Sequence, residues 1–266
     1  MDNVNKTLYI PLYGKATVSR KGIILHDPKA EEIWAREGFP LKGKSSSKWL
    51  AYTMGMRAAV FDQWLREQMA DAEDTLVIHI GCGLDSRAQR VGLADARWFD
   101  VDFPDVIRER KRYYSETDAY RMLGADARDP AWLGCLPKAE SALLVMEGVS
   151  MYLRQEELKA LLRAAGEHFA HVRVLMDCYT SFGAKASRFK NPINDVGVTT
   201  VYGLDDPKTL EDGTGLSFMK EHEMTPGTLI DTLTGMEKTI FKKVFAGRMA
   251  KKIYRMYEYG KAESGI

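Results

Sequence analysis

Between residues 48 and 180 the chain alternates short apolar runs with segments of helical periodicity. Apolar side chains within 48–69 recur every three or four positions, which predicts an amphipathic helix. Five apolar runs rich in β-formers predict strands at Thr75–Ile80, Arg97–Val101, Arg121–Ala125, Ala142–Met146 and Val172–Met176. Helices are expected between them at Asp85–Val91, Val106–Ser115 and Glu156–Ala170. Near-continuous apolar strands separated by helices indicate a parallel sheet covered on both faces.

The two ends of the chain are less regular. Residues 1–45 are expected to be irregular and turn-rich. After Tyr179 the pattern predicts a helix at Ser181–Lys190 and a polar, glycine-rich stretch at Asn191–Gly215. Two further strands are expected at Leu216–Lys220 and Lys252–Tyr259, with a helix between them. The chain is therefore predicted to be a doubly wound α/β domain with an N-terminal cap and a late insertion.

Composition narrows the possible locations and partners. The chain has 266 residues, 45% of them hydrophobic and 28% charged, as expected of one globular unit. No apolar run reaches the ~18–20 residues that cross a bilayer, and the first residues lack a secretory signal pattern. The formal net charge of +1 argues against a general positive field for nucleic acid. We therefore expect a cytoplasmic protein that binds neither membrane nor nucleic acid.

One basic run, over residues 238–255, departs from this balance. We expect it to be the solvated face of a helix whose buried stripe is Phe241, Val244, Phe245 and Met249, with a patch for an anionic partner as the alternative. The three cysteines lie far apart in the sequence, which suits a reducing compartment. The five histidines show no ligand spacing, so no metal site is expected.

Candidate chemistry lies where the predicted strands end, because ligands of open α/β sheets bind outside those ends. Gly81-Cys82-Gly83 follows the first strand, and glycines there let a ligand approach the backbone closely. The second strand ends in Asp100-Val101-Asp102, and a carboxylate at that place can accept both ribose hydroxyls of a nucleoside. Asp126 and Glu147 end the third and fourth strands. The pattern leaves open whether Asp100 or Asp102 faces the ribose.

Two ligand classes compete for this pattern. A dinucleotide site needs a third glycine where this chain has Ser86, and it must also accommodate a pyrophosphate. Three acids at successive strand ends instead suit a nucleoside with no phosphate and with a positive sulfonium, which is S-adenosylmethionine. A non-catalytic nucleoside-binding protein with the same fold stays open, because fold alone does not establish chemistry.

The motifs are also specific enough to suggest a family. The chain resembles the leucine carboxyl methyltransferase family, and within it the bacterial O-methyltransferases typified by the tetracenomycin polyketide carboxyl methyltransferase. The matching segments are IPLYGKA at 10–16, HDPKA at 26–30, MRAAVFDQWL at 56–65, VIHIGCGLDSRAQRV at 77–91, RWFDVDFPDVI at 97–107, GADARDPAWL at 124–133, LLVMEGVSMYL at 143–153 and YGLDDPKTLE at 202–211. The resemblance implies a class I S-adenosylmethionine-dependent methyltransferase, with a Rossmann-like, seven-stranded, mostly parallel sheet.

The resemblance further implies a role for each of nine residues. Gly81 and Gly83 would form the turn beneath the amino-acid part of the cofactor, whose carboxylate would pair with Arg57. Asp102 would hold the ribose, while Asp126 and the backbone N–H of Ala127 would bind the adenine. Glu147 would take the ammonium group, Tyr152 would close the same wall, and Lys15 would lie nearby.

The same resemblance implies three regions within one domain: a cap over 1–47, a cofactor-binding core over 48–180, and an acceptor-pocket region with the last strands over 181–266. No general base is evident, which favours a carboxylate of a small aromatic or polyketide-like acceptor. A hydroxyl acceptor and the carboxyl terminus of a protein remain alternatives. No catalytic residue is identified, and the oligomeric state is not predicted.

Overall fold

The structure is a computed structural model that describes residues 8–38, 41, 43–70, 74–93, 96–187 and 200–261. Within these residues the helices are α2 (Tyr9–Arg20), α3 (Pro28–Glu37), α4 (Lys48–Met69), α5 (Arg87–Val91), α6 (Pro104–Arg110), α7 (Gln155–His168), α8 (Ser181–Ser187), α9 (Gly227–Ile230), α10 (Gly235–Val244) and α11 (Arg248–Lys251). Short 3-10 turns are η1 (Gly43–Ser46), η2 (Pro130–Cys135), η3 (Ser150–Tyr152) and η5 (Pro207–Leu210). The strands are β1 (Thr75–Ile80), β2 (Arg97–Asp102), β3 (Tyr120–Gly124), β4 (Ser141–Met146), β5 (His171–Tyr179), β6 (Ser217–His222) and β7 (Tyr254–Gly260).

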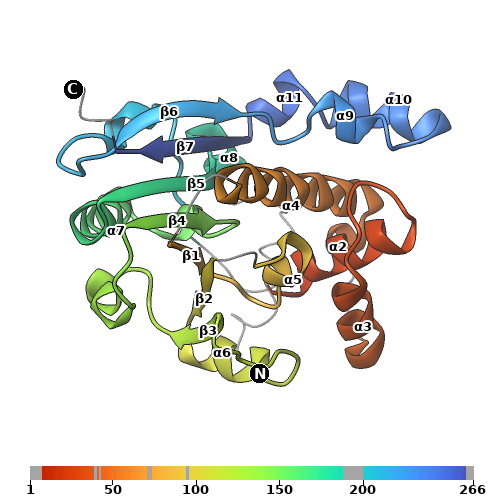
Figure 1. Ribbon diagram of the computed structural model, residues 1–266. Coiled ribbons are helices and arrows are strands. Elements are labelled where there is room, and N and C mark those ends of the chain that lie inside the picture. Colours follow the sequence, from red (N-terminus) through yellow and green to blue (C-terminus); the bar gives the residue numbers. More distant parts are fainter. Residues whose placement is uncertain are drawn as a thin grey trace.

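These strands form one sheet in the order β3-β2-β1-β4-β5-β7-β6 (Figure 1). Strands β1 to β5 run parallel, whereas β7 runs antiparallel to both β5 and β6. Ile80 at the end of β1 pairs with Val101 of β2 and with Met146 of β4. The residues that follow these three strands are therefore brought together at one edge of the sheet.

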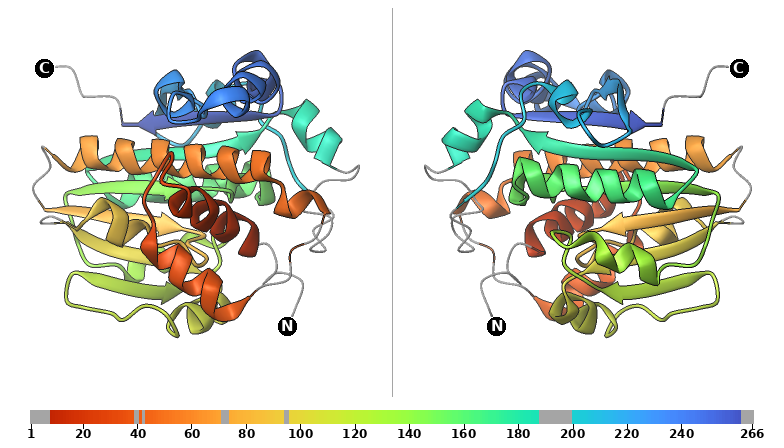
Figure 2. Two further views of the ribbon diagram at one scale, coloured as in Figure 1. Left: turned by 90° about the vertical axis from the view of Figure 1, so that its right-hand side faces the viewer. Right: turned by 90° about the vertical axis from the view of Figure 1, so that its left-hand side faces the viewer.

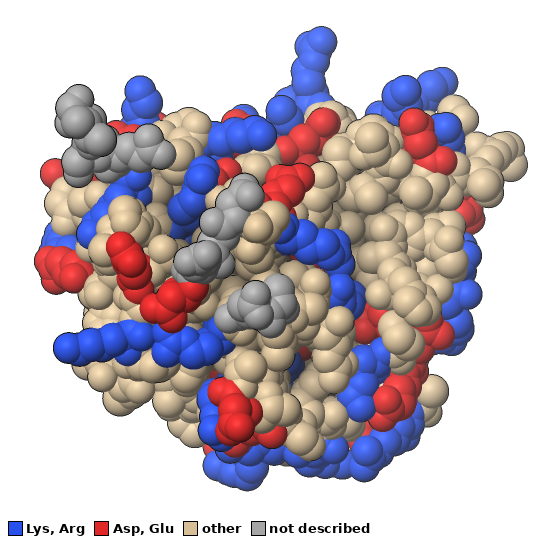
Figure 3. Space-filling view, viewed as in Figure 1, with Lys and Arg blue, Asp and Glu red and all other residues tan. Residues whose placement is uncertain are grey.

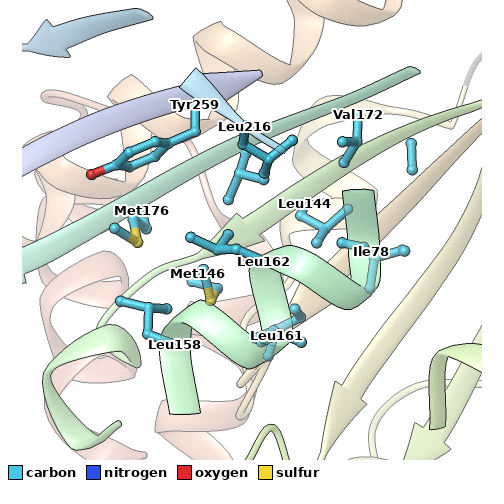
Figure 4. Packing of buried hydrophobic residues seen from close by; sticks show 14 of the residues in the cluster. Ile78, Leu144, Met146, Leu158, Leu161, Leu162, Val172, Met176, Leu216 and Tyr259 are labelled. Atoms are coloured by element: carbon cyan, nitrogen blue, oxygen red, sulfur yellow. The ribbon is translucent and has the colours of Figure 1, made fainter. Parts of the chain in front are cut away.

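Apolar side chains on both faces of the central strands explain why helices cover the sheet on both sides (Figure 2). Ile78 and Leu144 are fully buried on the face that α7 covers. Figure 4 shows them in the same cluster as Leu162 of α7. Val77 is in the cluster on the opposite face, with Phe61 of α4. Each buried side chain of this size stabilises the fold by about 1.5–3 kcal/mol. The sheet thus provides a rigid platform for the residues at its edge.

The expected architecture is confirmed. Helix α4 and strand β1 have the bounds that the apolar pattern predicts. Helix α6 departs most, because it ends at Arg110 instead of Ser115. The helix expected to reach Lys190 is seen as far as Ser187, and residues 188–199 lie outside the described part of the chain. No helix in that part is both long and apolar enough to span a membrane.

The expectation of an irregular N-terminal region was wrong. Residues 9–20 and 28–37 form α2 and α3. Helix α2 is buried on several sides and so lacks a simple apolar stripe. At Gly14 an added Cβ would lie only 2.7 Å from the Cβ of Met54, so this glycine lets α2 approach α4 closely. The side chain of Asp27 caps α3 by accepting a hydrogen bond from the backbone N–H of Ala30 at 2.9 Å.

The basic run is also arranged differently from the expectation. Phe241 is fully buried and Phe245 is half-buried, but Val244 and Met249 are 52% and 50% exposed. The expected buried stripe therefore contains only the two phenylalanines, which pack against α4. Elsewhere, basic and acidic side chains intermingle on the face shown in Figure 3, as the small net charge suggests.

Candidate functional site

Two adjoining cavities open at the carboxyl ends of the parallel strands. The larger has a volume of about 560 Å³ and the smaller about 280 Å³, and Leu8, Gly81, Gly148 and Tyr152 line both. All nine residues that the sequence singled out line one cavity or both. Lys15, Arg57, Gly83 and Glu147 line the larger, whereas Asp102, Asp126 and Ala127 line the smaller.

The floor where the cavities meet is the glycine turn after β1. Gly81 and Gly83 both have positive φ, at 66° and 51°. A Cβ at Gly81 would collide with the side chain of Val149. The backbone N–H of Gly81 donates to the carbonyl of Val101 at 2.7 Å, which attaches the turn to β2. Only glycine combines this backbone conformation with the close packing.

Asp102 and Asp100 at the end of β2 have different surroundings. Asp102 lines the smaller cavity and accepts from the backbone N–H groups of Gly83 and Phe103, at 2.8 and 2.7 Å. Burial nevertheless raises the pKa of Asp102 to about 6. Asp100 is fully buried, lines neither cavity and forms an ion pair with Arg110. Asp102 is thus the one of the two that a ligand in the cavity can contact.

Asp126 lies at the far end of the smaller cavity and is held by Arg128. The Nε of Arg128 is 2.9 Å from each carboxylate oxygen of Asp126. These hydrogen bonds lower the pKa of Asp126 below its usual value. The neighbouring Ala127 also lines this cavity. The carboxylate is therefore ionised and fixed in orientation at neutral pH.

Glu147 and Arg57 form a wall of the larger cavity at the end of β4, and the fully buried Asp177 contacts Arg57. Arg57 Nη2 lies 3.1 Å from Glu147, and its Nη1 lies 2.8 Å from Asp177 on β5. Glu147 also pairs with Arg87. Although burial opposes ionisation, Arg87, Lys15 and Arg57 together lower the pKa of Glu147 to about 2. Arg57 is therefore already held by two carboxylates, and the pattern of the sequence identified only one of them.

This wall belongs to a larger buried network of charges. Lys15 lies 3.2 Å from Asp85, which also pairs with Arg87 and Arg90. Among the described residues the connected network contains four cations, Lys15, Arg57, Arg87 and Arg90, and five carboxylates, Asp27, Asp62, Asp85, Glu147 and Asp177. The one carboxylate in excess makes this end of the cavity suited to a ligand with a net positive charge.

Other lining residues of the larger cavity have a different character. Its lining includes Met54, Met151, Tyr179, Phe245 and Tyr254. Tyr179 ends β5 and Tyr254 begins the antiparallel β7, so the two are register partners with ring centroids 4.3 Å apart. Sulfur-containing and aromatic side chains of this kind suit a flat, largely apolar ligand.

His79, Tyr152 and Tyr254 line this cavity and are poorly suited to act as a base at neutral pH. All five histidines are described, and of these only His79 lines either of the two cavities. His79 is buried, with Nδ1 3.2 Å from Asp100 and Nε2 3.5 Å from Arg87, and burial lowers its pKa. Burial also raises the pKa of Tyr152 and Tyr254 above the usual range. Likewise, no group of acids, histidines or cysteines in the described part of the chain is arranged to hold a metal ion.

Known proteins resemble this chain in sequence and in fold. The model of the leucine carboxyl methyltransferase family matches residues 9–166. The tetracenomycin polyketide synthesis O-methyltransferase TcmP of Streptomyces glaucescens is 31% identical over 243 residues, which are 90% of each chain. The S-adenosyl-L-methionine-dependent methyltransferase dpfgK of Gibberella zeae is 27% identical over 237 residues, 79% of this chain and 78% of that protein.

A solved structure shows the same fold. Magnesium protoporphyrin IX methyltransferase (ChlM) from Synechocystis PCC 6803, with bound S-adenosylhomocysteine (SAH), has a TM-score of 0.53 at 13% identity, over 88% of this chain and 93% of that chain. The resemblance seen in the sequence motifs is therefore confirmed. This chain belongs to the leucine carboxyl methyltransferase family and is an S-adenosylmethionine-dependent methyltransferase.

Proposed function

We propose that this enzyme methylates the carboxylate of a small aromatic or polyketide-like molecule. The observation that supports this most directly is that burial makes His79, Tyr152 and Tyr254 in the larger cavity poorly suited to remove a proton at neutral pH. A carboxylate is already ionised at neutral pH and needs no base, whereas a phenol must lose its proton during transfer. The methyl group itself is supplied by S-adenosylmethionine, which carries it on a positive sulfonium.

The charges of the two cavities fit this cofactor. S-adenosylmethionine has a sulfonium, an ammonium and a carboxylate, so its net charge is positive. The larger cavity offers a buried network with one carboxylate in excess, and it also presents Arg57 for a carboxylate. The smaller cavity offers the carboxylates of Asp102 and Asp126 for the hydroxyl and amino donors of a nucleoside. Each cavity therefore contains charged groups that complement the charges or the hydrogen-bond donors of the cofactor.

We assign the residues as follows. Arg57 binds the cofactor carboxylate through a fork of two N–H groups, because its hydrogen bonds to Glu147 and Asp177 use the N–H of Nε and one N–H of Nη1, and the other N–H groups remain for a ligand. Glu147 binds the ammonium group, and Asp102 accepts both ribose hydroxyls. Gly81 and Gly83 form the floor beneath the amino-acid part.

The remaining assignments concern the adenine and the walls. Asp126 accepts from the adenine amino group, and the backbone N–H of Ala127 donates to the ring. Tyr152 lines both cavities and would separate the cofactor from the part of the larger cavity that holds the acceptor. Lys15 is almost fully buried beside Asp85, so it would act on the cofactor through charge. By the same reasoning, the lining residues within 179–187 and 245–254 form the wall of the larger cavity that faces the acceptor.

Cofactor binding should weaken at acidic pH because of Asp102. With a pKa of about 6, Asp102 is ionised above this pH and protonated below it. A protonated carboxyl accepts ribose hydroxyls less well, so the affinity for SAH should fall about tenfold between pH 7.5 and 5. Glu147 and Asp126 have lowered pKa values and stay ionised across this range. Calorimetry at several pH values measures the effect, and Asp102→Asn should bind weakly without it. An affinity of the wild-type protein that does not change with pH would contradict the assignment.

The acceptor class can be decided from the product. The enzyme would be incubated with methyl-labelled S-adenosylmethionine and a panel of aromatic acids, phenols and peptides with free carboxyl termini. Label on the aromatic acids that mild alkali releases as methanol is the expected result, because a methyl ester hydrolyses and an aryl ether does not. The rate of the chemical step should change little between about pH 6.5 and 9, because a carboxylate of pKa ~4 stays ionised. Alkali-stable label confined to phenols would refute the proposal, and labelled peptides alone would indicate a protein acceptor.

A further inference from the structure

We propose that Asp177 is a positioning residue, which holds Arg57 and the Glu147–Gly148 turn in fixed relation so that they can grip the amino-acid end of the cofactor. Asp177 is fully buried and lines neither cavity, so it must act through its neighbours. The inference rests on the proposed cofactor site. Neither the sequence motifs nor the comparisons point to this residue.

The two carboxylate oxygens of Asp177 have separate partners. Oδ2 accepts from Arg57 Nη1 at 2.8 Å, and Oδ1 accepts from the backbone N–H of Gly148 at 2.6 Å. Gly148 directly follows Glu147 and has a φ of 72°, and its backbone N–H is held from outside this turn by Asp177. One side chain on β5 thereby joins an arginine of α4 to the end of β4.

The position of Asp177 itself is well determined. Its backbone lies within β5, where it pairs with Met256 of the antiparallel β7. The hydroxyl of Ser150 donates to its backbone carbonyl. The side chain therefore extends from a backbone that is held by pairing with β7 and by the hydrogen bond from Ser150 of η3. Such a scaffold can impose its geometry on Arg57, whose long side chain has more rotatable bonds.

The distribution of charge explains why Arg57 needs this second partner. Glu147 is shared between Arg57 and Arg87, and its assigned ligand is the ammonium of the cofactor. Within the described part of the chain, by contrast, Asp177 forms an ion pair with Arg57 alone. When the ammonium competes for Glu147, Asp177 still balances the buried guanidinium and keeps its remaining N–H groups directed at the cavity. Removing one partner from such a buried pair is costly, because the other charge is left uncompensated.

The experiment compares two ligands that differ only at the end in question. SAH contains the amino-acid part, whereas 5′-methylthioadenosine contains the same nucleoside and thioether sulfur without it. In Asp177→Asn the amide can accept one of the two hydrogen bonds but must direct its NH₂ at the other donor. We expect the Kd for SAH to rise about 10- to 100-fold and the Kd for 5′-methylthioadenosine to change less than about twofold.

Two further variants separate positioning from simple structural support. Glu258→Gln is the matched control, because Glu258 is also a buried carboxylate that contacts two basic side chains, Arg173 and His222, both at 2.6 Å, but it lines neither cavity. This control should lower the melting temperature without changing the ratio of the two Kd values. Asp177→Glu keeps the negative charge that Arg57 requires and should fold, but its displaced oxygens cannot keep both contacts. It should therefore also weaken SAH selectively, by at least about fivefold.

A double variant tests whether the effect passes through Arg57. In an Arg57→Ala background, adding Asp177→Asn should weaken SAH binding by less than about threefold more, since the group that Asp177 positions is already absent. Equal weakening of both ligands by Asp177→Asn, or wild-type SAH affinity in both Asp177 variants, would overturn the inference while leaving the cofactor site intact. If the wild-type protein bound neither ligand, the proposed cofactor site would fail, and this inference with it.

Discussion

Replacing Asp102 by alanine is expected to weaken SAH binding by about 10- to 100-fold. Its carboxylate lines the smaller cavity, and in the proposed site it accepts both hydroxyls of the ribose. Hydrogen bonds to a charged group contribute about 1.5–3 kcal/mol, which corresponds to this loss of affinity. The variant should remain folded, because the partners that Asp102 loses are two backbone N–H groups, of Gly83 and Phe103, beside an open cavity.

Calorimetric titration of SAH, together with thermal unfolding of the unliganded protein, measures both effects of the Asp102 variant. Asp105→Ala is a suitable control, because Asp105 lies three residues away on α6, where it is exposed and pairs with Arg108 at 2.7 Å. The control should bind SAH normally. If Asp102→Ala also binds normally, the ribose is not held by this carboxylate.

Replacing Asp100 by alanine should mainly affect stability. Asp100 is fully buried and receives hydrogen bonds from Trp98 and Tyr120 in addition to its ion pair with Arg110. Arg110 holds the pKa of Asp100 at about 2 despite the burial. Removing the carboxylate leaves the buried guanidinium uncompensated, which typically costs about 3–5 kcal/mol of the free energy of unfolding. The variant is therefore expected to unfold at much lower urea concentration than the wild-type protein.

Urea denaturation followed by far-UV circular dichroism gives this change in stability. The Asp102→Ala protein is the natural comparison, because the two carboxylates are separated by a single residue. The contrast between them is the informative quantity, since one should lose affinity and the other stability. An Asp100 variant as stable as the wild type would mean that the charge of Arg110 is balanced by its carbonyl partners, Gly83 and Asp85.

The central part of the fold could be predicted from sequence because its signals are local. The runs at Thr75–Ile80 and Ala142–Met146 are almost wholly apolar, as strands buried on both faces must be. Gly81 and Glu147 follow those runs directly and Asp102 ends the run at Arg97–Asp102, so their shared edge followed from parallel topology alone. The choice between Asp100 and Asp102 did not follow, because it depends on which carboxylate Arg110 contacts.

The N-terminal helices were missed for two different reasons. Helix α2 packs close against α4, and a helix that is buried widely shows little amphipathic period. Helix α3 did carry local signals, since Asp27 and Pro28 form a cap with a proline at the first turn, and Gly38 ends the helix with a φ of 58°. These three residues are local signals of a helix even though the residues around them are polar.

The second partner of Arg57 was missed because it is distant in sequence. Asp177 lies 120 residues from Arg57, on a strand whose apolar run was expected to end at Met176. No spacing rule connects an arginine on α4 with an aspartate on β5. The same holds for Lys15 and Asp85, whose contact depends on how α2 packs against the glycine turn. Contacts of this kind follow from tertiary packing and not from pattern.

The antiparallel direction of β7 has a consequence for how this protein can diversify. Because β7 begins where β5 ends, Tyr254 and Tyr179 lie side by side, and the helices α9 to α11 reach the same edge of the sheet (Figure 1). Among the described residues, the lining of the smaller cavity lies between Leu8 and Leu153, whereas residues within 179–187 and 245–254 contribute to the larger one. The smaller cavity and one wall of the larger cavity are therefore encoded in separate stretches of the gene. Substitutions or insertions in the later stretch can reshape the larger cavity while the residues that line the smaller cavity stay unchanged.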